Sequence, residues 1–326
     1  MKFVVKTVVV LIILIFSVFA CRDIISEMTK LQGDSTIDSH TTHLITHNNI
    51  SIPVNYYEKY VATYGITPPH SFQNVSNVVG HEPILQEIKA ISKLWDCKQH
   101  STLYQPPTGI LLYGPPGTGK TTLSKGICTH INANVSFLHV SSDLIENKYQ
   151  GEGLKFMRAV FTLCTKIEPC VVFFDEIDGL MSKRSDMDQS HVNNMKTMFL
   201  SGLDQLRDSK TNVLVICATN RPECLDPALM RRLELHFHMD VPTVEQKCNA
   251  LSNMIGGHSD DYTDFVLNVL PINATLHDLY TFIRYCIRTQ LLKADIILDV
   301  TEMDWGDIAL TSYYNEYKTL FKFINH

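Results

Sequence analysis

The sequence lacks any excess of basic charge. Its 326 residues include 28 Lys and Arg against 34 Asp and Glu, which gives a formal net charge of −6. Duplex nucleic acids are usually bound through clustered Lys and Arg, so this balance argues against a nucleic-acid partner.

Two further patterns are missing. The nine cysteines include no C-x-x-C pair, which favours buried free thiols in a reducing compartment over a disulfide framework or a zinc site. No H-E-x-x-H motif occurs, because His81-Glu82 is followed by Pro83 and by no second His at the required spacing. This argues against a metalloprotease.

Short apolar strands alternate with helices across residues 68–242. Such alternation predicts a large α/β domain in which a parallel sheet lies between two layers of helices. After Pro242 the pattern becomes helical, so residues 243–326 are expected to form a small helical lid domain. The expected strands are 109–113, 137–141, 171–175, 213–218 and 235–239, and the helices between them are 120–132, 154–167 and 192–206.

A glycine-rich motif follows the first of these strands. It matches G-x-x-x-x-G-K-[ST] between a buried strand and a helix, the context that a P-loop requires. Its backbone N–H groups can close around phosphates, and the helix N-terminus adds partial positive charge. We predict an ATP site in which Lys120 contacts the β- and γ-phosphates and Thr121 holds Mg²⁺. The motif consists of Gly114, Pro115, Pro116, Gly117, Thr118, Gly119, Lys120 and Thr121.

Polar residues end the third and fourth strands. Asp175 and Glu176 follow the apolar run 171–174, at the carboxyl end where open α/β sheets bind ligands. Asp175 is predicted to orient the Mg²⁺ shell, and Glu176 to polarise the attacking water as general base. Asn220 follows the fourth strand and is expected to contact this water or the γ-phosphate.

Two arginines, Arg231 and Arg232, lie far along the chain from the P-loop. They either stabilise charge on a neighbouring subunit's phosphate or form ordinary surface ion pairs. Tyr149, in the loop 148–153, is either a plain loop residue or a mobile finger that grips a polypeptide.

Together these motifs resemble those of the AAA ATPases. The resemblance covers residues 71–292 and includes Phe-Phe-Asp-Glu-Ile-Asp at 173–178 and Ala-Thr-Asn-Arg-Pro at 218–222. Within the family, the chain is similar to the group that holds spastin, katanin, fidgetin and the mitochondrial outer-membrane extractase. Residues 104–116 look most like the extractase.

The resemblance implies a ring, usually a hexamer, with ATP and Mg²⁺ at subunit interfaces. It places Arg231 and Arg232 at the arginine-finger positions. It also places Tyr149 in the substrate-gripping pore loop, and Val79 and Gly80 beside the adenine.

Three departures from the family pattern occur. His236 stands where relatives carry a further arginine, and Leu276 stands where they carry a glycine beside the nucleotide. Gln150 follows Tyr149 where relatives carry a second apolar or aromatic residue. None of these changes removes the P-loop or its acidic partners, so we expect catalysis.

One apolar run, from Val8 to Ala20, lies near the N-terminus. With residues 3–5 it reaches the roughly 20 residues that span a bilayer, although a cleaved signal peptide fits the local pattern equally well. We favour a retained transmembrane helix over residues 1–21, because secretion would place an ATPase where ATP is scarce. Residues 22–67 are expected to form a linker with one helix near 54–64.

The leading hypothesis is a membrane-anchored ATPase that extracts or unfolds polypeptides, including mislocalised membrane proteins, through a central pore. The resemblance points to the mitochondrial outer membrane or a related organelle, with the ATPase domain facing the cytosol. A microtubule-severing ATPase is one alternative, but residues 22–65 are few and not basic. A nucleotide-gated membrane scaffold with little turnover is another, motivated by His236 and Leu276.

Overall fold

The computed structural model describes residues 43–47, 50–67, 82–96, 106–131, 135–141, 152–182, 190–209, 211–255 and 258–293, together with Leu310 and Tyr314. The apolar segment 1–21, expected to be transmembrane, lies outside these ranges. Within them, no helix combines the length and the apolar character that crossing a bilayer requires.

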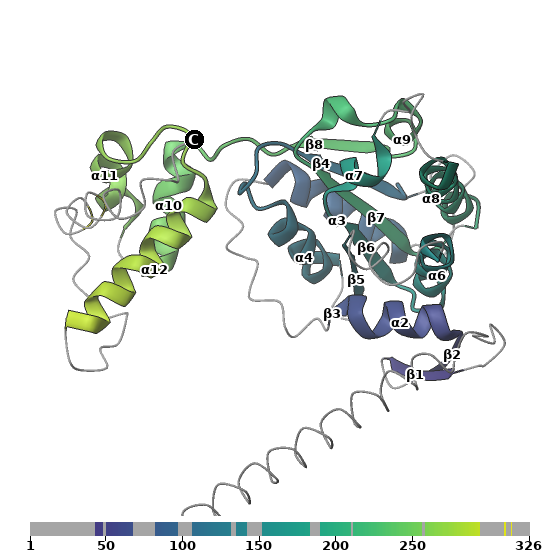
Figure 1. Ribbon diagram of the computed structural model, residues 1–326. Coiled ribbons are helices and arrows are strands. Elements are labelled where there is room, and N and C mark those ends of the chain that lie inside the picture. Colours follow the sequence, from purple (N-terminus) through teal and green to yellow (C-terminus); the bar gives the residue numbers. More distant parts are fainter. Residues whose placement is uncertain are drawn as a thin grey trace, which may run out of the picture.

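A six-stranded sheet forms the centre of the larger domain (Figure 1). All of its neighbouring strands are parallel except β3 and β5, which are antiparallel. The prediction of a parallel sheet is therefore wrong at this edge, because β3 runs antiparallel to β5 and, at two residues, is too short for its presence or direction to be read from the sequence pattern. In spatial order the strands are β3 (Ile66–Thr67), β5 (Ser136–Val140), β6 (Cys170–Phe174), β7 (Val213–Thr219), β4 (Gly109–Tyr113) and β8 (Leu235–His238).

Helices cover both faces of this sheet, as expected (Figure 1). Successive residues of a strand point to opposite faces, so Val215 belongs to the core that includes α2, α6 and α8, while Ile216 belongs to the core that includes α3 and α4. Short helices α7 and α9 follow β6 and β7. The bounds are α2 (Tyr56–Gly65), α3 (Glu82–Asp96), α4 (Lys120–Ile131), α6 (Gly153–Lys166), α7 (Ile177–Met181), α8 (Ser190–Asp208) and α9 (Pro227–Met230).

The C-terminal helices have a core of their own. The ring of Phe282 lies 5.7 Å from that of Phe265 and 5.2 Å from that of Tyr314, measured between centroids. Buried aliphatic side chains such as Leu251 and Leu279 complete this cluster. The helices are α10 (Val244–Ile255), α11 (Thr263–Asn268) and α12 (Leu276–Lys293), all within the segment expected to form the small helical domain.

Free thiols are confirmed in the described part of the chain. No disulfide occurs there, and most of its cysteines are buried. Burial raises the pKa of the Cys170 and Cys217 thiols well above the usual value, which disfavours the thiolate form of both.

Part of the expected linker 22–67 is folded. β1 (His43–His47) and β2 (Ile50–Val54) form an antiparallel hairpin, and α2 confirms the helix expected near 54–64. Val54 and Val61 are buried in the same core as α6. Hence the described residues of 43–67, which we call the N-terminal module, pack against the larger domain instead of linking to it loosely.

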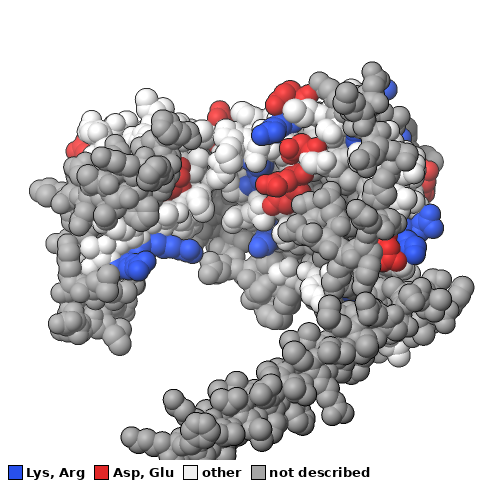
Figure 2. Space-filling model, viewed as in Figure 1, with Lys and Arg blue, Asp and Glu red and all other residues white. Residues whose placement is uncertain are grey.

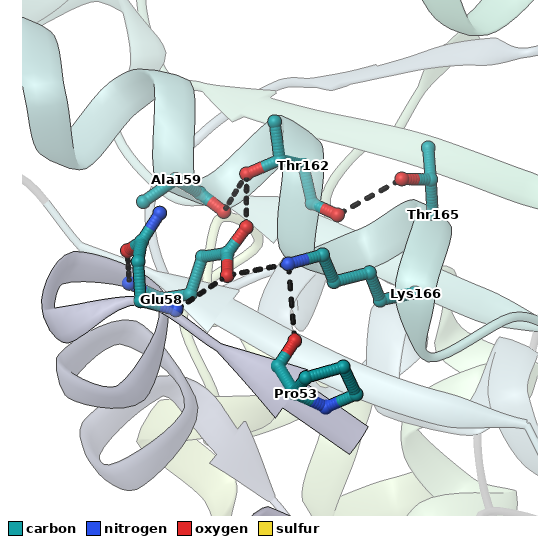
Figure 3. Close-up of polar contacts among 7 residues, drawn as sticks. Pro53, Glu58, Ala159, Thr162, Thr165 and Lys166 are labelled. Carbon is teal, nitrogen blue, oxygen red and sulfur yellow. Dashed lines mark hydrogen bonds and ion pairs between the residues drawn. The ribbon is translucent and has the colours of Figure 1, made fainter. Parts of the chain in front are cut away.

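A buried carboxylate joins this module to α6 (Figure 3). Glu58, 2% exposed, accepts hydrogen bonds from Nζ of Lys166 (2.7 Å), Oγ1 of Thr162 (2.7 Å) and the backbone N–H of Asn55 (2.9 Å). Lys166 also donates to the Pro53 carbonyl oxygen at 3.1 Å. Burial raises the pKa of Glu58, but the hydrogen bonds outweigh it and the pKa lies below its usual value.

Replacing Lys166 with Met should destabilise the protein, because it leaves Glu58 buried without its cation. We expect the free energy of unfolding at pH 7 to fall by about 1–3 kcal/mol in a denaturant titration. The exposed Arg207→Met is the matched control, with an expected change within about 0.5 kcal/mol. Since the pKa of Glu58 is lowered by folding, its contribution is present above the ordinary Glu range and is lost as pH falls through the lower folded value. Equal stability of wild type and Lys166→Met would contradict this account.

Candidate nucleotide site

The P-loop connects β4 to α4, as the sequence predicted. Gly114, Gly117 and Gly119 have φ angles of 149°, 77° and 93°, a region that side chains disfavour. A Cβ atom on Gly114 would in addition collide with the carbonyl oxygen of Met239. The loop therefore needs glycine both for its backbone path and for space.

Lys120 is held against this loop. Its ammonium donates to the carbonyl oxygens of Gly114 and Pro115, both at 2.8 Å, and the side chain is largely buried. Burial lowers the pKa of Lys120, while the negative charge of Asp175 opposes the shift. A lysine in this position can reach phosphate oxygens bound by the loop.

Thr121 and Asp175, the predicted Mg²⁺ residues, lie side by side. Oγ1 of Thr121 donates to Oδ2 of Asp175 at 2.9 Å, and Oδ1 of Asp175 accepts the backbone N–H of Glu176 at 3.0 Å. A hydroxyl and a carboxylate are oxygen ligands of the kind that Mg²⁺ prefers. These residues therefore fit the expected metal ion.

Glu176 and Asn220 end neighbouring parallel strands. Glu176 is exposed and has a left-handed backbone (φ 50°, ψ 46°), a strained conformation that is common at functional sites. The end of β7 is fixed by Thr219, whose hydroxyl donates to Asp178 at 2.7 Å and accepts the Arg221 N–H at 2.9 Å. Both predicted catalytic side chains thus lie at the same edge of the sheet.

These residues surround one cavity of about 380 Å³. Residues 116–122, Asp175, Glu176 and Asn220 line one side, and three residues of α12 line the other. In the space-filling view a hollow separates the two domains, with acidic and basic side chains on the wall of the larger one (Figure 2). The three residues of α12 are Leu276, His277 and Tyr280.

The small domain contacts the P-loop directly. The backbone N–H of His277 donates to the Gly117 carbonyl oxygen at 3.4 Å. A Cβ atom on Gly117 would lie 2.8 Å from Oγ1 of Thr275. Leu276, which stands where relatives carry a glycine, lies between Thr275 and His277 and is part of the cavity wall.

The two arginines lie in different environments. Arg232 forms a two-pronged ion pair with Asp204, through Nε at 2.9 Å and Nη2 at 2.8 Å, and Nη1 donates to the Ala228 carbonyl oxygen at 3.0 Å. Arg231 is exposed. Neither is among the residues that line the cavity of the same chain.

Three predicted site residues, Val79, Gly80 and Tyr149, lie outside the described residues. His236 is described and is an exposed residue of β8, the edge strand beside β4.

Comparison with known proteins agrees with this geometry. Residues 110–241 match the ATPase family associated with various cellular activities (AAA). The chain carries an AAA domain. The matched part of this AAA domain runs from β4 to just beyond β8 and so encloses the P-loop, the acidic pair, Asn220 and both arginines.

The similarity to known proteins extends beyond residues 110–241. The outer mitochondrial transmembrane helix translocase of Homo sapiens is 36% identical over 202 residues, which cover 60% of this chain and 55% of that protein. The Danio rerio protein of the same name is 37% identical over 210 residues, which cover 62% and 54%. The chain spans about half the length of these curated relatives. The crystal structure of the FIGL-1 AAA domain with ADP has a TM-score of 0.62, covers 82% of this chain and 95% of its own, and at 23% identity shows a shared fold.

Sequence reasoning missed several residues of the site. Asp178 and Thr219 lie within the quoted motifs, yet their mutual hydrogen bond was not predicted. The roles of His277 and Tyr280 in the cavity wall, and of Asp204 beside Arg232, depend on contacts between distant segments and carry no local signal.

Glu176→Gln and Lys120→Met should separate turnover from binding. Glu176→Gln retains the P-loop and should lower ATP turnover by roughly 10²–10⁴-fold with little loss of affinity, the range for a lost general base. Lys120→Met removes a phosphate contact and should weaken nucleotide binding itself. Phosphate release and titration with a fluorescent nucleotide check the two. Unchanged turnover in Glu176→Gln would exclude the assigned role.

Proposed function

We propose that this chain is a membrane-anchored AAA ATPase that couples ATP hydrolysis to the extraction or unfolding of proteins through a central pore. The observation that carries the proposal is the single cavity that joins the P-loop, the Thr121–Asp175 pair, Glu176 and Asn220. A phosphate site, a metal site and a base in one cavity are the requirements of ATP hydrolysis.

In this proposal each residue has a separate task. The P-loop N–H groups and Lys120 bind the phosphates, and Thr121 and Asp175 hold Mg²⁺, which neutralises developing charge on the phosphates when bound. Glu176 accepts a proton from the attacking water, and Asn220 orients that water. The wall formed by α12 excludes bulk solvent from the reaction.

The site is completed by a neighbouring subunit in a ring, most simply a hexamer. Neither Arg231 nor Arg232 is among the residues that line the cavity of its own chain, which supports a role in trans. The ion pair with Asp204 fixes Arg232, whereas Arg231 is exposed and can extend toward a neighbour's nucleotide.

The proposed substrate class and location are supported by the names of the relatives. Proteins named outer mitochondrial transmembrane helix translocase match this chain at 36–37% identity, which supports membrane proteins as substrates and the outer mitochondrial membrane as location. Residues 1–21 would supply the membrane anchor, Tyr149 the grip on the polypeptide, and Val79 and Gly80 contacts to the adenine. Microtubule severing is not favoured by these relatives.

Mixing two inactive variants tests the role of Arg231 in trans. Glu176→Gln keeps the arginine and loses the base, and Arg231→Ala does the reverse. Each alone should lose turnover, by roughly 10³-fold for a missing arginine finger. A mixture should regain part of it, because some interfaces combine an intact base with an intact arginine. Arg284→Ala, which changes an exposed arginine of α12, is the control and should leave ATP turnover unchanged. If mixing the two inactive variants restores no turnover, Arg231 lies outside the neighbour's site.

Extraction is tested with full-length protein and a single-span membrane protein in liposomes. Wild type should release the substrate in the presence of ATP, and Glu176→Gln should not. Equal release by both would contradict coupling to hydrolysis. Nucleotide-dependent oligomers with negligible phosphate release would instead support the scaffold, and tight, salt-sensitive tubulin sedimentation would support severing.

A further inference from the structure

The N-terminal module contacts α6 at both ends of that helix. At the first end, Oη of Tyr57 donates to Oε1 of Glu152 at 2.8 Å and accepts from Nζ of Lys155 at 3.1 Å. The Tyr57 ring packs edge-on against Phe156, with centroids 5.1 Å apart. Tyr57 is 6% exposed, whereas Lys155 is exposed, so the ring lies in the core and the hydroxyl meets its partners at the edge of the core.

Glu152 is used in an unusual way. It is the N-cap residue of α6, yet its side chain makes no capping hydrogen bond. Its carboxylate is turned toward Tyr57 of α2 instead. The Glu152 carboxylate, which also accepts from Nζ of Lys155 at 3.4 Å, therefore ties the start of α6 to the N-terminal module, while the Glu152 backbone carbonyl accepts the N–H groups of Lys155 and Phe156.

At the other end of α6, Glu58 binds Lys166 and Thr162 (Figure 3). The hairpin adds a further contact nearby, since Nε2 of His47 lies 2.6 Å from Oγ of Ser136, which donates to the Ile167 carbonyl oxygen at 3.0 Å. Contacts at residues 152 and 166 span the whole helix. A helix held at both ends cannot pivot against its partner.

The polar character of these contacts matters. Apolar side chains in these positions would also be buried, but they would leave α2 and α6 freer to slide against each other. Charge-assisted hydrogen bonds require one geometry. Burying Glu58 costs free energy that a purely apolar interface would avoid. What the module gains is a fixed register on α6.

We propose that the N-terminal module is a force-transmitting coupling, in which Tyr57 and Glu58 are positioning residues that make α6 move as one body with α2. The inference rests on the proposed function, because an anchored extractase must pass the pulling force on its substrate back to its anchor. The module is the described segment through which that force enters the AAA domain. Loss of the Tyr57–Glu152 hydrogen bond should then lower the amount of substrate extracted per ATP without lowering the rate of ATP hydrolysis.

Tyr57→Phe is the decisive variant, since it removes the hydroxyl and keeps the ring on Phe156. In full-length protein, phosphate release should stay near the wild-type rate while substrate extracted per ATP falls by roughly tenfold, the factor expected for one lost hydrogen bond to a charged group. Thr63→Val is the matched control, because among the described residues that hydroxyl bonds only within α2, to the Lys59 carbonyl oxygen. It should leave both quantities unchanged.

Two variants of Glu152 extend the test. Glu152→Ala should behave as Tyr57→Phe, and Glu152→Gln should retain coupling because its amide oxygen still accepts from the Tyr57 hydroxyl. If Tyr57→Phe lowers phosphate release and extraction in the same proportion, Tyr57 only supports the fold and the proposal is overturned. It is equally overturned if neither quantity changes.

Hydrogen exchange gives a readout that does not depend on extraction. In wild type, amides of α2 and α6 should change their exchange rates together when ATP is added, and in Tyr57→Phe those of α6 should change alone. Independent changes in wild type would contradict the coupling. A wild type that hydrolyses ATP, shows joint changes and extracts nothing would contradict the proposed function only.

Discussion

Parallel pairing of β4, β7 and β6 is the constraint on which the site depends. Tyr113 pairs with Thr219, and Phe174 pairs with Cys217, so the three strands end at one edge of the sheet. The residues that follow them are the P-loop, Asn220 and Asp175. Because these strands are buried on both faces, their register is set by the two cores, and a slip by one residue would exchange the cores. Core packing and the placement of the site are therefore one requirement.

Much of the AAA domain was predictable because its signals are local. Each expected strand between Gly109 and Met239 differs from the observed one by at most a residue at each end, and the motif spacing gave the P-loop and its acidic partners. The helix α3 was missed although Ile84, Ile88, Ile91 and Trp95 follow a helical period and are buried. Its signal was present and was overlooked.

Other features could not be read from local patterns. The N-terminal module appeared as a linker because its apolar residues become a core only when α6 covers them, and a strand of two residues such as β3 has no period. The Asp204–Arg232 ion pair joins residues 28 positions apart, and α12 meets Gly117 across some 160 positions. Such contacts follow from the tertiary fold, and no spacing in the sequence announces them.

The small domain is joined to the P-loop at two points. One is the chain connection, which leaves the larger domain just after Met239, a residue that lies against Gly114 and donates its backbone N–H to the Tyr113 carbonyl oxygen at 2.8 Å; the other is α12, where the His277 N–H donates to the Gly117 carbonyl oxygen. Two fixed points define an axis. A rigid body held in this way keeps a single easy rotation, about the line that joins them. The loop that would bind the phosphates is therefore also the hinge of the small domain. The positions of Gly114 and Gly117 set the direction in which this domain can rotate.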